Sequence, residues 1–430
     1  MNLVSKSEPP FSLRREAIAG ITTFFTMSYI IVVNPSILTT PGTGMNFNGV
    51  MTATVLLSAA MTLLMGVYAK LPFAVAPGMG INAFFTFTLI LGQKIPWPAA
   101  LGMVFWAGVF FVVLSITPIR AMIAQAIPKQ LRIASAVGIG IFLTFIGLKN
   151  IGLVTSHPAT LLKPGELDYR AGLSFLGLVV TLIFLRRKNS LAFIAGIFSV
   201  TLIAWVMDRI PTPPQLLSQP DFHSVFLKLD IWGALKLSLL PAIISILFTD
   251  LFDSLSTFIG VSQANNLFDK KGNPRNLKEG LIVDAFATLG AGLVGTSSGT
   301  AYIESSAGIE IGGRTGWTSV FTALCFLPCF FLAPLAAMVP VYATAPVLIV
   351  VGAMMFRTVS ELSLGKLEDL IPSFLTIILI PLTFSITQGL LWGFVSHVLL
   401  YALANRAKEL SPMMVAIGVV SLGLIILEQR

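Results

Sequence analysis

Apolar stretches separated by short polar or basic loops make up nearly the whole chain. Most of them approach the roughly 20 residues that an α-helix needs to cross the hydrocarbon core of a bilayer. Their number predicts an all-α polytopic membrane protein with about 14 transmembrane segments. A last apolar run, residues 413–427, is short for a full crossing, and the pattern leaves its placement open.

The third apolar stretch cannot form one continuous helix, because Pro72, Pro77 and Gly78 interrupt it. We expect an extended piece at residues 73–76, followed by a helix that begins near Met79. Such a break places free backbone N–H groups and the positive end of a helix dipole inside the membrane.

The tenth stretch, residues 295–316, reads GTSSGTAYIESSAGIEIGGRTG and is broken by glycines and hydroxyl side chains. It carries Glu304 and Glu310, and a charged side chain at bilayer depth costs about 2.5–3.5 kcal/mol on insertion scales. Irregular backbone is tolerated at that depth only inside protein or beside a wet cavity. We therefore predict that this segment lines a binding site, with Glu304 near a helix start and Glu310 at the cytoplasmic rim.

The two broken segments occupy matching positions in the two halves of the chain, and an odd number of crossings separates them. Paired interrupted segments of opposite direction are typical of inverted-repeat transporters with a binding site near the bilayer midplane. The sequence therefore predicts a 7+7 inverted repeat, in which residues 208–233 form the loop between the halves.

The basic residues indicate the orientation. Most of the 27 lysines and arginines fall on the side of the N-terminus under this segmentation, including the runs 186–188 and 270–271. Because such residues accumulate in cytoplasmic loops, we expect a multi-pass protein of the cell (plasma or inner) membrane with a cytoplasmic N-terminus. The same rule accounts for the net charge of +8, and we expect no nucleic-acid partner, since no soluble domain could bind one.

Acidic residues in apolar surroundings are the candidates for chemistry. Asp250 and Asp253 lie on one face of the eighth segment, and no Lys or Arg falls at matching depth to pair with them. We favour Asp253, because hydroxyl residues follow it in the sequence. Asp284 lies near the start of the ninth segment beside a basic loop, where compensation of the helix dipole is the simpler interpretation.

Two motif matches for enzymes lack the required context. GTSSG resembles a nucleophile elbow, which needs a strand, a sharp turn, a helix and a catalytic histidine. GAGLVG resembles a dinucleotide fingerprint, but it ends a membrane helix instead of following a strand. Cys325 and Cys329 lie in an apolar run and are interpreted as small buried hydrophobic residues. We expect no enzyme activity, no cofactor and no metal.

Four motifs together resemble those of the AzgA-like adenine/guanine/hypoxanthine permeases, which belong to the nucleobase/ascorbate transporter superfamily. They are GITTFFTMSYIIVVNPSIL, APGMGINAFF, FTDLFDSLSTFIG and GTSSGTAYIESSAGIEIGGRTG. The similarity extends from about residue 14 to about residue 404. The resemblance implies proton-coupled uptake of a purine base, which binds between the half-helices of segments three and ten. A homodimer is the expectation for the family.

The resemblance also implies two domains that move against each other in an elevator-like manner. A core domain, residues 16–118 and 234–338, would bind the substrate. A gate domain, residues 132–207 and 342–404, would flank it, and residues 405–430 would form a C-terminal tail.

The motifs supply the predicted site. Asp253 and Glu304 match the family's acids, and one of them is expected to carry the coupled proton. The full set of expected substrate-binding residues is Asn82, Asp253, Glu304, Gly80, Phe84, Thr26 and Ser305. A purine suits such a site, because a carboxylate accepts from its N–H groups and an amide both donates and accepts.

Three other functions stay open at this stage. An anion transporter of the sulfate or bicarbonate type can share the 7+7 fold, although two buried acids would repel an anionic substrate. A channel would need a continuous polar pore, whereas the polar residues here form clusters. A membrane enzyme would need a nucleophile and a base within reach of each other, and the sequence offers no such pair. The sequence does not say which purine is preferred.

Overall fold

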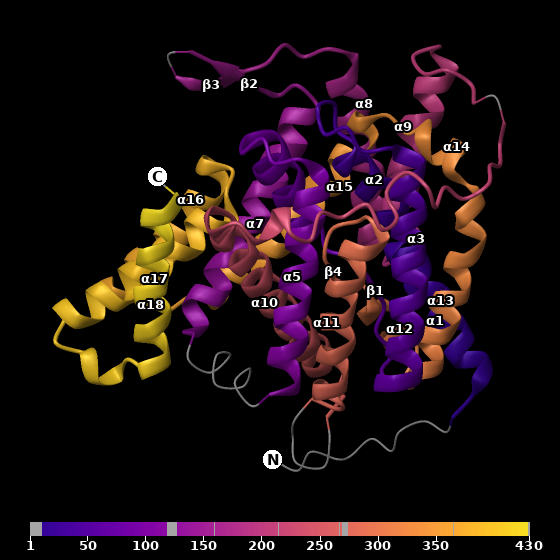
Figure 1. The fold of residues 1–430 in the computed structure, drawn as a ribbon. Helices are drawn as coiled ribbons and strands as arrows, with labels where there is room; N and C mark the ends of the chain where they lie inside the picture. Colours follow the sequence, from indigo (N-terminus) through magenta and orange to yellow (C-terminus); the bar gives the residue numbers. More distant parts are fainter. Residues whose placement is uncertain are drawn as a thin grey trace.

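The apolar stretches fold into helices that lie side by side (Figure 1). The computed structural model describes residues 11–117, 127–158, 160–213, 215–265, 267–268, 274–363 and 365–428. Among these residues, eight helices are long and apolar enough to cross a membrane, and four shorter apolar helices accompany them. The all-α polytopic membrane fold is therefore confirmed, whereas the number 14 stays a prediction. Lys270 and Lys271 lie outside the described residues.

The first half of the chain contains most of the long helices in their predicted order. Its described helices are α1 (Leu13–Met27), α2 (Ile30–Leu38), α3 (Phe47–Leu64) with η1 (Met65–Ala69), α4 (Met79–Ala83) with η2 (Phe84–Gly92), α5 (Trp97–Ile116), α7 (Lys129–Asn150), α8 (Tyr169–Arg186) and α9 (Ala192–Val206). The first apolar stretch is thus two helices, and the third begins its helix at the expected residue.

The second half contains more short elements. Its helices are η3 (Gly233–Leu235), η4 (Leu237–Leu239), α10 (Leu240–Asn265), α11 (Leu277–Val294), α12 (Ser305–Glu310), α13 (Gly316–Phe326), η5 (Leu327–Phe331), α14 (Ala333–Ala337), α15 (Val341–Phe356), η6 (Arg357–Glu361), α16 (Leu367–Thr383), α17 (Ile386–Leu403), η7 (Ala407–Glu409) and α18 (Pro412–Glu428). The tail predicted at residues 405–430 therefore contains a helix of its own.

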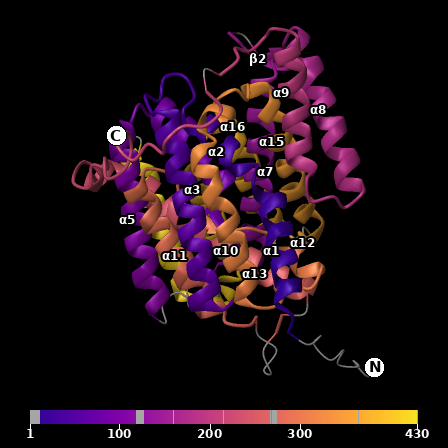
Figure 2. The same ribbon diagram turned by 90° about the vertical axis from the view of Figure 1, so that its right-hand side faces the viewer.

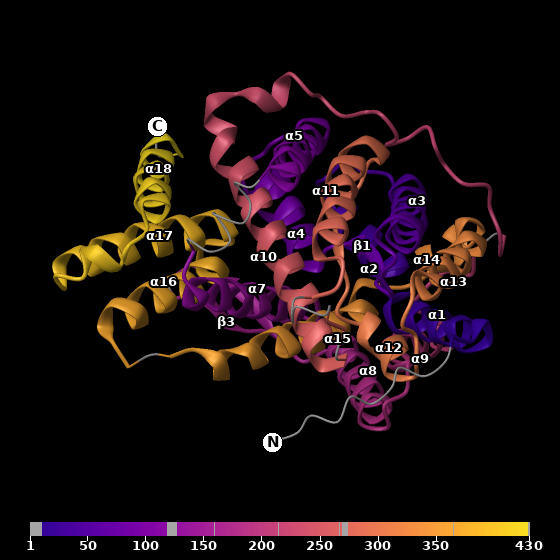
Figure 3. The same ribbon diagram turned by 90° about the horizontal axis from the view of Figure 1, so that it is seen from below.

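The helices pack as two groups. In one group α1 packs on α13, α5 packs on α11, and α3 contacts α2, α11 and α13. In the other, α7 packs on α15 and α16, and α8 packs on α9 and α15. Figure 2 shows α8 and α9 together at one edge of the molecule, and Figure 3 shows α16, α17 and α18 at another.

In the part of the chain that the structure describes, four short strands complete the fold. β2 (Val154–His157) and β3 (Leu161–Pro164) form an exposed hairpin between α7 and α8, at one end of the helix bundle (Figure 1). β1 (Val75–Pro77) and β4 (Gly299–Ala301) are instead completely buried among the helices of the first group. Extended backbone at such depth needs partners from the protein itself, because lipid offers none.

Candidate functional site

The two broken segments meet as an antiparallel pair of strands. β1 (Val75–Pro77) pairs with β4 (Gly299–Ala301), with Ala76 opposite Thr300. Each strand supplies the backbone hydrogen bonds that the other lacks inside the membrane. The extended piece expected at residues 73–76 is confirmed, with the paired part shifted slightly toward the C-terminus.

A half-helix follows each strand. The N–H of Gly78, between β1 and α4 (Met79–Ala83), donates to the carbonyl of Ser298 at 2.9 Å. α12 (Ser305–Glu310) follows β4 after a short turn. Because the strands are antiparallel, the two half-helices leave in opposite directions, and the positive ends of their dipoles lie near the strand pair.

Glu304 is the residue immediately before α12, and its side chain is half-buried. Its Oε1 atom accepts a hydrogen bond from the hydroxyl of Tyr29 at 2.7 Å. Tyr29 lies between α1 and α2, is 1% exposed, and its ring centroid is 4.8 Å from that of Phe193 on α9. Tyr29 was not among the residues predicted for the site, although a tyrosine in an apolar stretch needs a partner for its hydroxyl.

Asp253 lies on α10, in the neighbourhood of Thr300 and Glu304. Its carboxylate interacts with the hydroxyl of Thr300 on β4, and the charge of Glu304 acts on it. Asp253 is half-buried, as Glu304 is. The structure therefore brings together the two acids that the sequence analysis selected, although they come from different segments.

Asn82 adds an amide from the other broken segment. Its side chain is fully buried on α4, and its Oδ1 atom accepts a hydrogen bond from the hydroxyl of Ser297, just before β4. Its Nδ2 atom has no partner among the described residues. Since buried polar groups are almost always satisfied, this amide is available to a ligand or a water molecule.

Gly80 and Phe84 lie on the same half-helix as Asn82. Phe84 begins η2 and is 1% exposed. A Cβ atom on Gly80 would lie only 2.6 Å from Cγ2 of Ile139 on α7. Gly80 therefore permits the close approach of α4 to α7, and its contact with a substrate stays a prediction.

Thr26 and Ser305 bond to backbone. The Thr26 hydroxyl donates to the carbonyl of Thr22, one turn earlier in α1, at 2.7 Å. The Ser305 hydroxyl accepts from the N–H of Ala74 at 3.0 Å and is fully buried. Ser305 thus joins the start of α12 to the residue that precedes β1. Contacts of these two residues with a substrate also stay predictions.

Asp284 has a different role from the one predicted for it. α11 begins seven residues earlier, at Leu277, so Asp284 is too far along the helix to compensate its N-terminal dipole, and that interpretation is wrong. Its Oδ1 atom accepts the N–H of Ala301 at 2.9 Å, and its Oδ2 atom accepts the hydroxyl of Ser254. Asp284 is fully buried and holds the end of β4.

Asp250 supports the same strand from α10. Its Oδ2 atom accepts hydrogen bonds from the hydroxyl of Ser298, at 2.7 Å, and from that of Thr288. Its Oδ1 atom has no partner among the described residues, and the side chain is completely buried. Asp250 and Asp284 thus form a buried polar layer that holds β4 in place. Asp253 interacts with Thr300 on the same strand, so this layer also fixes the hydroxyl that Asp253 contacts.

A further acid, Glu16, was missed. It is 3% exposed on α1 and accepts the backbone N–H groups of Arg314, at 3.1 Å, and Thr315, at 3.3 Å. These N–H groups precede α13, so Glu16 caps that helix from another segment. Glu310 is exposed at the end of α12, and its position at the cytoplasmic rim stays a prediction.

Sequence comparison places the chain among known permeases. The profile of the "Permease family" matches residues 14–391. The permease MJ0326 of Methanocaldococcus jannaschii is 43% identical over 95% of this chain and 94% of its own length. The adenine permease AdeP of Escherichia coli is 38% identical over 94% of this chain and 91% of its own length. The guanine/hypoxanthine permease PbuG of Bacillus subtilis is 36% identical over 95% of each chain.

Structural comparison finds the same fold in more distant proteins. The transmembrane domain of the cyanobacterial bicarbonate transporter BicA matches with a TM-score of 0.66, over 90% of this chain and 98% of that one, at 16% identity. The murine anion transporter Slc26a9 in its inward-facing state matches with a TM-score of 0.63, over 93% of this chain and 70% of that one, at 10% identity. These identities establish a shared fold and no more. From its sequence matches, the chain belongs to the Permease family, within the AzgA-like branch of the nucleobase/ascorbate transporters that its four motifs indicate.

Proposed function

We propose that this chain is a secondary transporter that carries purine nucleobases across the cell membrane. Relatives that match nearly the whole chain are named adenine or guanine/hypoxanthine permeases. The observation on which the proposal rests is the placement of Asp253, Glu304 and the unpartnered Nδ2 atom of Asn82 around one buried strand pair. The basic loops favour a cytoplasmic N-terminus.

The chemistry of this site matches a purine. A purine is a flat apolar ring system with N–H donors and ring-nitrogen or carbonyl acceptors at its edge. The carboxylates of Asp253 and Glu304 accept from such donors, and the free N–H group of Asn82 donates to an acceptor. Phe84, on the same half-helix as Asn82, offers an aromatic ring that can pack on the base.

The paired acids also support coupling to protons. Asp253 and Glu304 lie close enough for their charges to interact. The ion pairs among the described residues involve Lys129, Arg170 and Arg406, and no buried acid takes part in one. Two carboxylates in one poorly solvated site repel each other, and a proton on either of them removes that repulsion. We propose that the coupled proton binds to this pair.

The division of the helices supports an elevator-like movement. Asp253, Asn82 and Glu304 belong to the group formed by α1–α5 and α10–α14, which we propose as the core domain. α7–α9 and α15–α17 would form the gate. The contacts described between the groups include the close approach of Gly80 to Ile139 and the ring contact of Tyr29 with Phe193. Both are packing contacts, which a sliding movement can exchange at small cost.

An anion transporter is the less favoured alternative. Its support is the fold shared with a bicarbonate transporter and an anion transporter at 16% and 10% identity, and fold alone does not determine function. The site itself contains two carboxylates and no described Lys or Arg in an ion pair with them. An anionic substrate would be repelled there.

Uptake by a host strain without its own purine transporters tests the proposal. We expect uptake of a radiolabelled purine that increases at low external pH, with competition by adenine, guanine or hypoxanthine but not by uracil. Asp253→Asn and Glu304→Gln should abolish uptake while the protein still reaches the membrane. Glu310→Gln, an exposed change on α12, is the matched control and should retain uptake. Uptake by both site variants with an unchanged pH dependence would contradict the proposed coupling.

A further inference from the structure

The last helix, α18 (Pro412–Glu428), lies beyond the part of the chain that the Permease family profile matches. It contains 17 residues, which corresponds to a length of about 25 Å at 1.5 Å per residue. That length is at the lower limit for a helix that crosses the hydrocarbon core. Length alone therefore does not distinguish a crossing helix from one that lies on the membrane surface.

The packing of α18 gives its direction. Near its middle, Gly418 lies against α17, since a Cβ atom there would be 2.7 Å from Cγ2 of Val398. Near its end, Leu424 and Ile425 share a hydrophobic cluster with Leu391, near the start of α17. Residue numbers thus rise along α18 as they fall along α17. The two helices are therefore antiparallel, and α18 runs alongside α17 back toward the start of α17.

The far end of α18 reaches the start of α10. The cluster around Leu424 and Ile425 also contains Leu240 and Ile244, the first turns of α10. α18 additionally contacts η4, the short helix that leads into α10 from the loop between the halves. The end of α18 therefore lies close to the segment that leads from the loop between the halves into α10, and its start follows the end of α17.

The surface of α18 is unsuited to a position on the membrane surface. Between Met413 and Leu427 the only polar side chain is that of Ser421, which is 2% exposed. Of the α18 side chains that the structure describes, up to Ile426, the large ones that point away from the protein are all apolar: Val415, Val419, Val420, Leu422 and Ile426. A helix that lies in the interface carries a polar face toward water. α18 has none, so lipid is the environment that suits its outer face.

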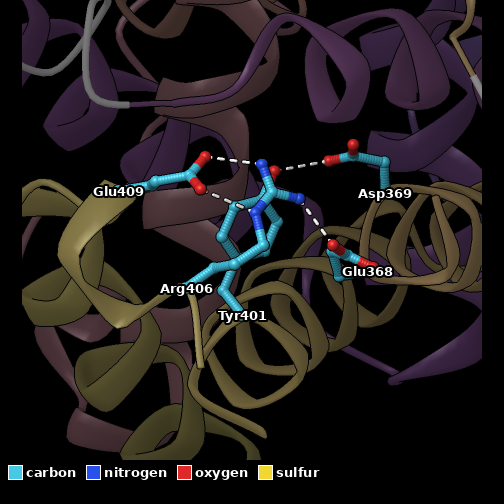
Figure 4. Close-up of polar contacts among 5 residues, drawn as sticks. All are labelled: Glu368, Asp369, Tyr401, Arg406 and Glu409. Carbon is cyan, nitrogen blue, oxygen red and sulfur yellow. Dashed lines mark hydrogen bonds and ion pairs between the residues drawn. The ribbon is translucent and has the colours of Figure 1, made fainter. Parts of the chain in front are cut away.

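A charged cluster marks the start of α18, as Figure 4 shows. The guanidinium of Arg406 pairs with Glu368 at 2.5 Å and with Glu409 at 2.5 Å. It also lies 4.8 Å from the ring of Tyr401, whose hydroxyl donates to Asp369 at 2.7 Å. The cluster joins the turn before α18 to the first turn of α16. Such a concentration of charge belongs at the water boundary, and the chain turns there from α17 into α18.

We propose that α18 crosses the membrane from the face that holds Arg406 to the opposite face, as a crossing additional to the predicted 14. It packs across the line where α17 of the proposed gate meets α10 of the proposed core. Residue 428 would then lie on the same face of the membrane as the β2–β3 hairpin. The proposal concerns topology and does not depend on the identity of the substrate.

Cysteine labelling tests this topology. In a background with Cys325 and Cys329 changed to alanine, single cysteines are placed at Lys163 on β3, at Lys408 in η7, or after residue 430 through a short Gly-Ser linker. Cells are treated with a membrane-impermeant maleimide before or after permeabilisation. A thermal unfolding midpoint in detergent near that of the parent shows that each variant is folded.

We expect the linker cysteine to label under the same condition as Lys163→Cys and under the opposite condition to Lys408→Cys. Because the two reference positions lie on opposite faces, the comparison is valid whichever face is cytoplasmic. Labelling of the linker cysteine together with Lys408→Cys would overturn the proposal, since a surface-lying or half-inserted α18 gives that result.

Discussion

Tyr29→Phe is the change that examines the candidate site most directly. It removes one oxygen atom, the donor of the 2.7 Å hydrogen bond to Oε1 of Glu304. The ring remains, and with it the contact with Phe193 at 4.8 Å between centroids. The substitution therefore isolates the hydrogen bond from the packing of a side chain that is 1% exposed.

The expected magnitude follows from the charge and exposure of the acceptor. A hydrogen bond to a charged group contributes about 1.5–3 kcal/mol, and one between neutral groups about 0.5–1.5 kcal/mol. Glu304 is half-buried, so water can replace part of the lost bond, and a loss of about 1.5 kcal/mol is the reasonable expectation. That value corresponds to a fall of about tenfold in uptake efficiency, because 1.4 kcal/mol is a factor of ten.

Initial rates of purine uptake, divided by the amount of folded protein in the membrane, measure this effect. Tyr302→Phe is the matched control: its hydroxyl is also buried, but it donates to the backbone carbonyl of Pro77 at 2.5 Å. We expect the control to lower the thermal unfolding midpoint with a smaller effect on uptake.

A double-mutant cycle in detergent then measures the interaction energy between Tyr29 and Glu304. Tyr29→Phe should lower the unfolding midpoint in the parent protein and leave it nearly unchanged when Glu304 is already alanine, because neighbouring residues that interact are not additive. Uptake within twofold of the parent, together with additive midpoints, would refute the argument that Tyr29 holds Glu304 in position.

Two further changes test the proposed movement. Gly80→Ala places a methyl group 2.6 Å from Cγ2 of Ile139, so transport should slow about fivefold to a hundredfold, because such strain costs about 1–3 kcal/mol. Ile139→Ala should restore it in the double variant, and failure of that rescue in a folded protein would show that the contact does not limit transport. A disulfide between Leu240→Cys and Leu424→Cys, which share a cluster, should stop uptake if α10 slides past α18. The matched pair Leu391→Cys and Leu424→Cys joins α18 to the gate and should leave uptake intact; equal inhibition by both pairs would contradict the proposed sliding.

Local sequence determined where the helices are and where they break. The mean hydropathy of a stretch as long as one transmembrane helix depends only on the residues in that stretch. For this reason the predicted apolar stretches coincide with observed helices. The breaks followed from Pro77, Gly78 and the glycines near residue 299, because proline and glycine act on their own backbone. The acids of the site could be selected for the same reason, since charge in an apolar stretch is conspicuous.

Only the tertiary structure decided what each polar group contacts. Asp253 and Asp284 look alike in the sequence, yet Asp253 interacts with the hydroxyl of Thr300, whereas Asp284 binds the backbone N–H of Ala301. The role of Tyr29 depends on a residue 275 positions away along the chain. The direction of α18 likewise depends on its packing against α17 and α10. Hydropathy and propensity describe a residue and its neighbours, whereas these contacts join segments that are distant in sequence, and only the packed helices bring them together.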